Sequence, residues 1–382
     1  MPFSYWQEPC LPGNTVIFME QQSLCTLIST RAFELGFAAV GFAVVEPMDP
    51  SPLRAWLEAG YGAEMHFLQR HLPLRADLTA VMPGARSVIC GALPYAGPTP
   101  GESPLGAVAC YARGEDYHRV VTERLRRLWA EIKAVVPAAE GRVFVDSGPL
   151  PERELARRAG IGWVGRHSCL LHPQLGSRFV LGEILTTLAL PPATPLAGDC
   201  GSCRRCLDAC PTGALREPGV VDARRCLSYL SIEHHGALPR EVRPQLGTRL
   251  FGCDACQDAC PYNQHLPVYA TPLAPRAEQL ACDLPTLLAL SVEEFAARFR
   301  HSPLKRAKRT GLLRNACVAL GNLAAPMHRE ALRVAIHDDE PVIRAHAAWA
   351  LGRLGDGEAL RWALSEETDI DVRAEIILAA GE

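Results

Sequence analysis

Eight of the fifteen cysteines lie in two groups and one linking position whose spacing suits iron–sulfur chemistry. The first group reads C-x2-C-x2-C-x3-C-P, the bacterial ferredoxin spacing, in which three thiolates hold one cluster and the fourth reaches the other cluster. The second group reads C-x2-C-x3-C-P and is one ligand short, so the cysteine between the groups is its natural replacement. The predicted ligands of the first 4Fe-4S cluster are Cys200, Cys203, Cys206 and Cys260, and those of the second are Cys210, Cys226, Cys253 and Cys256.

Two structural zinc sites are the alternative, because C-x2-C pairs also suit tetrahedral zinc. We favour clusters, since zinc would not need Pro211 and Pro261 after the last cysteine of each group. The other seven cysteines are scattered and are interpreted as small buried hydrophobes. Thiolate clusters imply a reducing compartment, the N-terminal segment does not resemble a signal peptide, and no apolar run approaches the roughly 20 residues that span a bilayer. The sequence therefore predicts a cytoplasmic protein without disulfides.

Basic side chains gather in one segment towards the C-terminus. No acidic residue lies between Glu294 and Glu330, whereas eight lysines and arginines fall in the interval from Arg298 to Arg329, in a chain of net charge -3. A solvated face is the usual explanation of a charge run, but the complete lack of carboxylates favours a site for a polyanion, with nucleic acid as the preferred partner. The predicted nucleic-acid-binding residues are Arg298, Lys305, Arg306, Lys308, Arg309 and Arg314.

The C-terminal segment contains a repeat. The segment ACVALGNL at 316–323 recurs as AAWALGRL at 347–354, and VRAEIILAAG at 372–381 matches IRAHAAWALG at 343–352. Small and apolar residues at helical spacing, with a glycine after each helix, indicate stacked helix pairs that resemble HEAT repeats. Such a stack is a binding surface, and the basic segment lies at its start.

The first half is predicted to be an α/β or α+β domain. Helices are expected at 20–35 and 117–136 and strands at 37–45, 87–95 and 142–146, the last of which delivers Asp146 to a Ser-Gly-Pro turn. An acid at a strand end that faces a glycine-rich return is a common place for chemistry. An aspartate before Ser-Gly-Pro is equally well explained as a helix cap or turn former. These residues alone leave both interpretations open.

An ordered set of motifs resembles the epoxyqueuosine reductase family, from about Met19 to the end of the chain. The motifs are YARGEDYH at 111–118, VDSGPLPERELARRAGIGWVGRHSCLL at 145–171, CGSCRRCLDACPTGAL at 200–215, RCLSYLSIEHHG at 225–236 and FGCDACQDACPYN at 251–263. The resemblance implies an α+β protein with an α/β cobalamin-binding reductase-like domain, a bacterial ferredoxin-like two-cluster domain and C-terminal HEAT-like repeats. The expected bounds are 1–18 for an N-terminal extension that could be disordered, 19–192, 193–270 and 271–382.

The resemblance also implies an activity: reduction of epoxyqueuosine at the wobble position of tRNA to queuosine, the last step of queuosine synthesis. Removing an epoxide oxygen takes two electrons and two protons, whereas a 4Fe-4S cluster delivers one electron at a time. Cob(II)alamin would bridge the two, as the cofactor that carries the reactivity. Asp146 matches the catalytic aspartate of the family, and we expect it to be a general acid whose pKa is raised by burial against the corrin.

Further cofactor contacts are implied with the same resemblance. Tyr111 and His118 match the segment near the corrin, although a helix start explains them too. Arg166 matches a lysine that touches the cofactor, and Ser228 and Asp254 lie beside cluster cysteines. The loop Glu233, His234 and His235 is a candidate RNA contact or simply exposed.

The expected partners are the anticodon arm of a tRNA that carries epoxyqueuosine and a low-potential electron donor such as a flavodoxin or ferredoxin. No membrane contact is expected, and a monomer is the expected state. Two alternatives remain: a cobalamin-dependent enzyme like the reductive dehalogenases, and a ferredoxin-type electron carrier whose repeats bind a protein. A carrier needs neither a corrin site nor Asp146, so cobalamin in the purified protein would exclude it.

Overall fold

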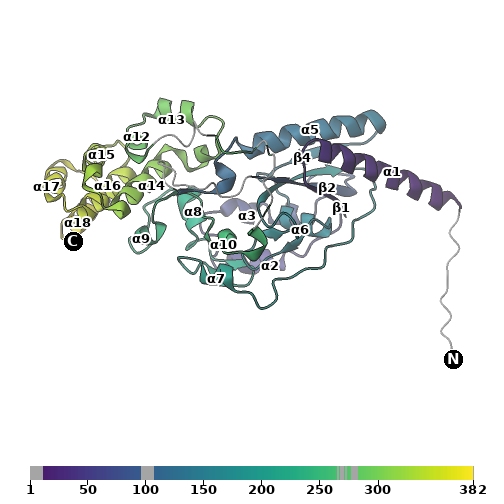
Figure 1. The fold of residues 1–382 in the computed structure, drawn as a ribbon, viewed down its shortest axis with the longest axis horizontal. Helices are drawn as coiled ribbons and strands as arrows, with labels where there is room; N and C mark the ends of the chain where they lie inside the picture. The colour runs from purple at the N-terminus through teal and green to yellow at the C-terminus, as the bar shows by residue number, and fades with distance from the viewer. Residues whose placement is uncertain are drawn as a thin grey trace.

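The computed structural model describes residues 12–95, 107–264 and 283–381, with a few positions between 266 and 276. A sheet domain lies at one end of the molecule and a stack of helices at the other, with the cluster region between and beneath them (Figure 1). The predicted α+β class is confirmed by these elements. Of the predicted N-terminal extension, residues 12–18 belong to the first helix and residues 1–11 lie outside the described part of the chain.

The sheet domain is built on four antiparallel strands in the order β1-β2-β7-β4. Along β2 the side chains alternate, so that Ile89 packs towards α1 and α5 while Val88 packs towards α6. Both faces of the sheet are therefore covered, which explains why β2 is buried along its whole length. The strands are β1 (Ala39–Val44), β2 (Ser87–Pro94), β4 (Gly141–Phe144) and β7 (Phe179–Thr186), and the covering helices are α1 (Pro12–Glu34), α5 (Tyr117–Val135) and α6 (Glu152–Arg158).

Shorter elements complete this domain. One of them, β3, pairs in parallel with β10 of the cluster region and so joins the two parts of the chain. The shorter elements are α2 (Ser51–Glu58), α3 (His66–Arg70), α4 (Leu72–Ala76), β3 (Ala107–Val108), β5 (Trp163–Val164) and β6 (Leu170–Leu171).

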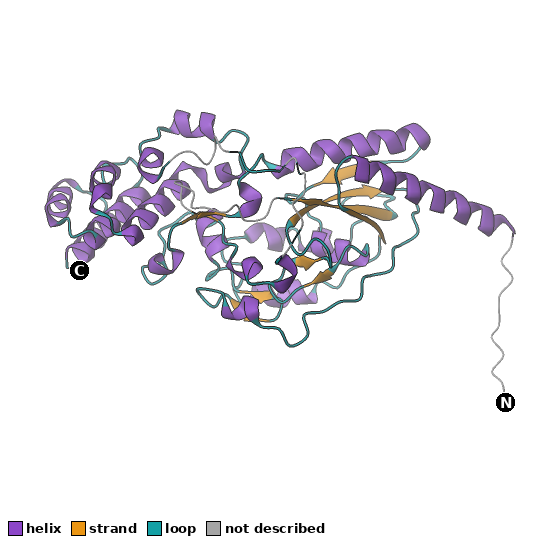
Figure 2. Ribbon diagram, in the orientation of Figure 1, coloured by secondary structure: helices purple, strands orange, loops and turns teal. Residues whose placement is uncertain are grey.

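The cluster region consists of loops and short helices (Figure 2). A one-turn helix lies within each cysteine group, α7 in the first and α10 in the second, so the two groups have matching local structure. The elements are α7 (Arg205–Asp208), β8 (Leu215–Glu217), β9 (Val220–Val221), α8 (Leu227–Ile232), α9 (Arg243–Leu246), β10 (Arg249–Phe251) and α10 (Ala255–Asp258).

The helical repeats stack through glycines inside the helices. A Cβ on Gly321 would lie 2.9 Å from the Cα of Ala350, and one on Gly352 would lie 2.5 Å from the carbonyl oxygen of Ala379. The sequence interpretation that placed these glycines after each helix was wrong, because they are needed where neighbouring helices touch. The helices are α12 (Leu284–Leu288), α13 (Val292–Arg298), α14 (Lys308–Leu323), α15 (Arg329–Ala335), α16 (Pro341–Arg353), α17 (Gly357–Glu366) and α18 (Ile370–Ala380).

Candidate cluster ligands and active site

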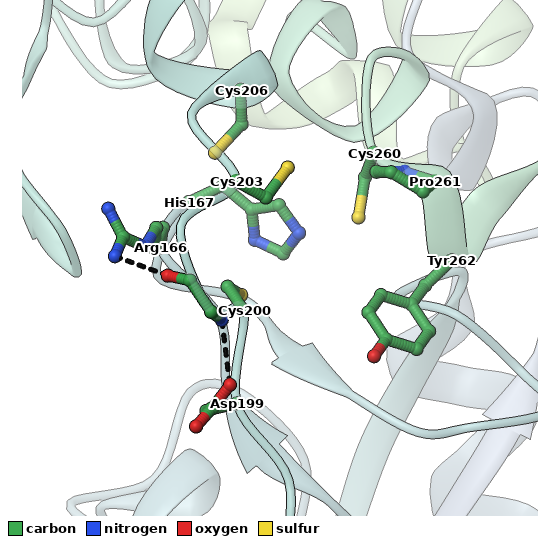
Figure 3. Close-up of a pocket in the computed structure, with 10 residues that line it drawn as sticks. Arg166, His167, Asp199, Cys200, Cys203, Cys206, Cys260, Pro261 and Tyr262 are labelled. Atoms are coloured by element: carbon green, nitrogen blue, oxygen red, sulfur yellow. Dashed lines mark hydrogen bonds between the residues drawn. The ribbon is translucent and has the colours of Figure 1, made fainter.

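One cavity of about 370 Å³ is lined by four thiols from both cysteine groups. They are the set predicted for the first cluster, and Cys260 of the second group reaches across to join the three of the first group (Figure 3). Among the described residues, no three histidine, cysteine, aspartate or glutamate side chains converge closely enough to hold a single metal ion.

The other four predicted ligands also lie together. Burial raises the pKa of the Cys226 thiol, the backbone N–H groups of Tyr229 and Ser228 oppose this, and the nearby Cys253 and Cys210 raise it further. Burial likewise raises the pKa of Cys256, with contributions from Cys226, Cys253 and Cys210. The structure thus brings the second predicted set together around Cys226.

A ninth thiol lies at this place and was missed by the sequence analysis. Cys169 contributes to the raised pKa of Cys256, and burial raises the pKa of Cys169 itself to about 11. It belongs to neither spacing pattern, so nothing in the sequence distinguishes it from the other scattered cysteines.

Asp146 follows β4 with a left-handed backbone, φ 54°. Its Oδ2 accepts hydrogen bonds from the hydroxyl of Tyr117 at 2.7 Å and from Nε2 of His118 at 3.1 Å. The Nδ1 of His118 lies 2.8 Å from Oδ1 of Asp116, the residue that caps α5. Because both ring nitrogens face carboxylates, both must donate, and the histidine is an imidazolium.

The charges of this group set the pKa values of His118 and Asp146. Burial would lower the pKa of His118, but its hydrogen bonds to Asp116 and Asp146 outweigh burial and raise this pKa to about 9. The hydrogen bond from His118 holds the pKa of Asp146, whose side chain is 58% exposed, below its ordinary value. The expectation of a raised pKa concerned burial against a bound corrin and stays a prediction for that state, in which the corrin must outweigh the cationic partner.

This arrangement predicts a titration. Since the pKa of His118 is raised from 6.5 to about 9, the ion pair stabilises the fold fully below pH 6.5, and its contribution is lost as the pH rises through about 9. Histidine labelled with ¹³C should show a His118 titration near pH 9 by NMR. In an Asp116→Asn variant the midpoint should fall, because one acceptor loses its charge. A wild-type midpoint at or below 6.5 would contradict the ion pair.

Two carboxyl groups lie close to the Asp146 loop. Glu152 accepts a hydrogen bond from the backbone N–H of Asp146, and Glu183 on β7 is fully buried with no hydrogen-bond partner for either carboxyl oxygen. Burial first, and then the charge of Asp146, raises the pKa of Glu152 to about 7, and burial raises that of Glu183 well above its ordinary value. Because burial disfavours the charged form, the fully buried carboxyl group of Glu183 favours its protonated form. A glutamate within the apolar strand FVLGEILT was the signal that the sequence analysis overlooked.

Two of the predicted corrin contacts, Tyr111 and Asp254, lie near Asp146. Burial raises the pKa of Tyr111, with further contributions from the charges of Asp146 and Asp254. The Tyr111 ring packs between Tyr117 and Phe251, at centroid distances of 5.8 and 6.3 Å. One Asp254 oxygen accepts a hydrogen bond from the backbone N–H of Cys110 at 2.7 Å.

The other two predicted contacts lie elsewhere or act differently. Arg166 lines the first thiol cavity and donates to the carbonyl of Gly201 at 2.6 Å, so it is not brought to Asp146. Ser228 is half-buried, and it is its backbone N–H that acts on the Cys226 thiol.

The basic segment has carboxylate partners from other parts of the chain. Lys305 pairs with Asp116 at 2.8 Å, Arg306 with Glu233 at 2.7 Å, and Arg309 with Asp338 at 2.6 Å. The segment has no acidic residues of its own in the sequence, but carboxylates from other parts of the chain lie beside it in the fold. Glu233, a candidate RNA contact, instead binds Arg306.

The prediction that Arg314 contacts tRNA is contradicted. Arg314 is fully buried and donates hydrogen bonds to the carbonyls of Leu230, His234 and Gly236. Its guanidinium anchors the loop after α8 to the repeats and cannot reach a phosphate. Arg298 lies on α13 with its guanidinium 6.0 Å from the ring centre of Phe299, whereas Lys308 is exposed.

Three family models match separate parts of the chain. The model described as Epoxyqueuosine reductase QueG, DUF1730 matches residues 75–147, the 4Fe-4S double cluster binding domain matches 199–263, and HEAT repeats match 304–381. These matches favour clusters over zinc in the thiol sites. No helix in the described part of the chain is long and apolar enough to cross a membrane.

Curated relatives and solved structures agree with the family models. The chain is 41% identical over 340 residues to the epoxyqueuosine reductase of Xanthomonas campestris, which covers 86% of this chain and 95% of that protein. It is 39% identical over 346 residues to that of Escherichia coli, covering 88% and 90%. A crystal structure of epoxyqueuosine reductase with an epoxyqueuosine-modified tRNA-Tyr stem loop superposes with a TM-score of 0.88 at 34% identity, covering 94% and 99%.

The fold and the two thiol sites define an iron–sulfur oxidoreductase with a helical-repeat domain. The sequence identity of about 40% to curated epoxyqueuosine reductases, over most of the chain, identifies the family. The chain belongs to the epoxyqueuosine reductase family, and it is a reductase that acts on tRNA.

Proposed function

We propose that this chain reduces the epoxide of epoxyqueuosine at the wobble position of tRNA to the cyclopentene of queuosine, using cobalamin supplied with electrons by two 4Fe-4S clusters. The reaction consumes two electrons and two protons and releases the epoxide oxygen as water. One observation supports the proposal: contacts of 2.8 to 3.1 Å link Asp146 through His118 and Asp116 to Lys305 of the basic segment. This linkage supports a proton source beside a site for a polyanion.

The chain itself would supply the protons. One proton would lie on His118, which is hydrogen-bonded to Asp146, and a second on the buried carboxyl group of Glu183. Asp146 would donate a proton to the departing epoxide oxygen and would regain one from His118. A positioned acid typically raises the rate by 10²- to 10⁴-fold. The hydrogen bond from the Asp146 N–H to Glu152 would hold the left-handed turn that aims the carboxyl group.

The cobalamin site is proposed at Tyr111, His118, Asp146 and Asp254. When bound, cobalamin would accept electrons singly and deliver them as a pair to the substrate. The residues present fit this role, because an aromatic wall of Tyr111 and Tyr117 offers an apolar surface and Asp254 adjoins the second set of thiols. Ser228, beside the Cys226 thiol, stays a proposed contact, whereas Arg166 is not included because it donates to the carbonyl of Gly201.

The direct test is anaerobic incubation of the cluster-loaded protein with cobalamin, a strong reductant and tRNA carrying epoxyqueuosine, followed by nucleoside analysis. Queuosine should appear only when cobalamin is present. Persistence of epoxyqueuosine with both clusters and cobalamin bound would reject the function. Equal turnover without cobalamin would reject the proposed cofactor. The physiological electron donor, proposed to be a flavodoxin or ferredoxin, is replaced here by the chemical reductant.

tRNA is proposed to bind three exposed members of the basic segment, Lys305, Arg306 and Lys308, with its anticodon arm towards Asp146. Each cation that neutralises a phosphate releases counterions, so binding weakens as salt rises. Changing all three to glutamine should weaken tRNA binding and reduce the slope of log affinity against log salt, by about 0.7 to 0.9 for each phosphate that is no longer neutralised.

The control for this variant is Arg54→Gln, which removes an exposed charge from α2, outside the repeats. Arg309 is left unchanged, because its side chain is only 17% exposed. Fluorescence anisotropy over a salt series measures both affinity and slope. An unchanged slope in the triple variant would place the tRNA on another surface.

A further inference from the structure

His167 enters the first thiol cavity without a protein partner for one ring nitrogen. Its side chain lines the cavity together with Cys200, Cys203, Cys206 and Cys260 (Figure 3). The residue is only 4% exposed, and its Nε2 has no hydrogen-bond partner. A buried polar atom without a partner costs free energy, so such an atom in a cavity calls for an explanation.

The other ring nitrogen determines where the proton is. The Nδ1 of His167 accepts a hydrogen bond from the backbone N–H of Cys169 at 3.1 Å. A nitrogen that accepts cannot carry a proton, so the ring is neutral and its hydrogen is on Nε2. The unpartnered atom is therefore a donor.

The cavity offers this donor mainly sulfur. Four of the ten residues that line the cavity are the thiols predicted to hold the first cluster, and Arg166, the other large donor, is turned to the carbonyl of Gly201. Hydrogen bonds to the sulfurs of an iron–sulfur cluster help to set its reduction potential, because they stabilise the more negative, reduced form.

We propose that the Nε2–H of His167 donates a hydrogen bond to a sulfur atom of the first cluster and raises its reduction potential. The inference rests on the proposed ligation of this cluster by the four thiols, but not on the substrate. Asp199, Gly201 and Pro261 at the rim of the cavity are exposed, and Tyr262 is 37% exposed, so this cluster lies near the surface. A raised potential would favour it as the first acceptor of electrons from a donor outside the chain.

Two substitutions separate the two ring nitrogens. Asparagine places its oxygen near the position of Nδ1, so His167→Asn keeps the acceptor for Cys169 and removes the donor in the cavity. Glutamine places its nitrogen near the position of Nε2, so His167→Gln keeps a donor and loses the acceptor. A role as cluster donor predicts that only the Asn variant has a lowered potential, whereas a purely structural role predicts a disturbed Gln variant and a normal Asn variant.

The measurement is an anaerobic redox titration of the cluster-loaded protein followed by EPR, with the second cluster as internal reference. In His167→Asn the reduction equilibrium of the first cluster should shift about tenfold towards the oxidised form, which is about 59 mV for one electron. The second cluster should keep its potential. An Asn variant with both clusters at wild-type potentials would overturn the proposal.

A second measurement uses the unaltered protein, in case the Asn variant fails to load its first cluster. After exchange into heavy water, electron–nuclear double resonance of the reduced first cluster should detect one coupled deuteron that the Gln variant retains. Absence of an exchangeable coupled deuteron in the wild type would overturn the proposal. Neither readout uses turnover, so a failure of the proposed activity would be seen separately.

Discussion

An Asp146→Asn variant is expected to keep both clusters, cobalamin and tRNA binding while its turnover falls by about 10²- to 10⁴-fold, the usual contribution of a positioned acid. Breaking the C–O bond of the epoxide leaves an alkoxide-like oxygen that must be protonated as it departs. Asparagine can still accept the hydrogen bonds from Tyr117 and His118, so the turn is preserved. It cannot carry a proton to the oxygen, and without its charge His118 loses one of the two carboxylates that raise its pKa.

The rate is measured in single turnover with pre-reduced cobalamin, so that electron supply does not limit the reaction. Asp49→Asn is the matched control, because Asp49 also accepts a backbone hydrogen bond in a turn, from the N–H of Ser51. The control should react at the wild-type rate. If Asp146→Asn also reacts at that rate, Asp146 is a turn residue, as the sequence alone equally allowed.

The site around Asp146 shows where sequence reasoning ends. The position of Asp146 at a strand end was visible in the sequence, and the family resemblance indicated its role. The direction of its pKa shift was not, because it depends on a 3.1 Å contact with His118, 28 residues away. Burial and a cationic partner act in opposite directions on a carboxyl group, and only their relative strength in three dimensions decides the outcome.

The basic segment illustrates the same limit for charge. Its lack of acidic residues was read directly from the sequence, but the carboxylates of Asp116, Glu233 and Asp338 come from elements far away in the chain. Small and apolar residues predicted the repeat helices, and in α14 and α16 such residues are buried on nearly all sides of the helix. This pattern did not predict that Arg314, on the first of these helices, points inward to the carbonyls after α8.

The cysteine spacing was the most informative local signal, since it predicted a set of four thiols that includes one from the distant second group. The structure brings all four to one cavity. The prediction succeeds because a cluster needs four ligands whatever path the chain takes between the two cysteine groups. Cys169 belongs to no such spacing pattern, and its position beside the predicted cluster ligands is visible only in the structure.

Replacing Cys226 by serine is expected to remove the second cluster, to leave most of the first, and to abolish turnover. Thiolates are the ligands of 4Fe-4S clusters, and a serine hydroxyl at this position would leave the second set one thiolate short. Cys226 lies among Cys210, Cys253 and Cys256, whereas the first cavity does not include it. Iron and sulfide should therefore fall by about half, in line with the loss of one of two cubane clusters.

The matched control is Cys169→Ser, which removes the buried thiol beside Cys256 that belongs to neither predicted set. This variant should keep the iron content and the EPR signals of both clusters. If Cys169→Ser lost the second cluster and Cys226→Ser kept it, Cys169 would be the fourth ligand in place of Cys226. Full iron content in both variants would show that neither cysteine is needed to hold a cluster. The proposed ligand set of the second cluster would then be wrong. The same comparison decides whether spacing in the sequence or proximity in the fold identifies a ligand, because Cys226 is supported by both and Cys169 by proximity alone.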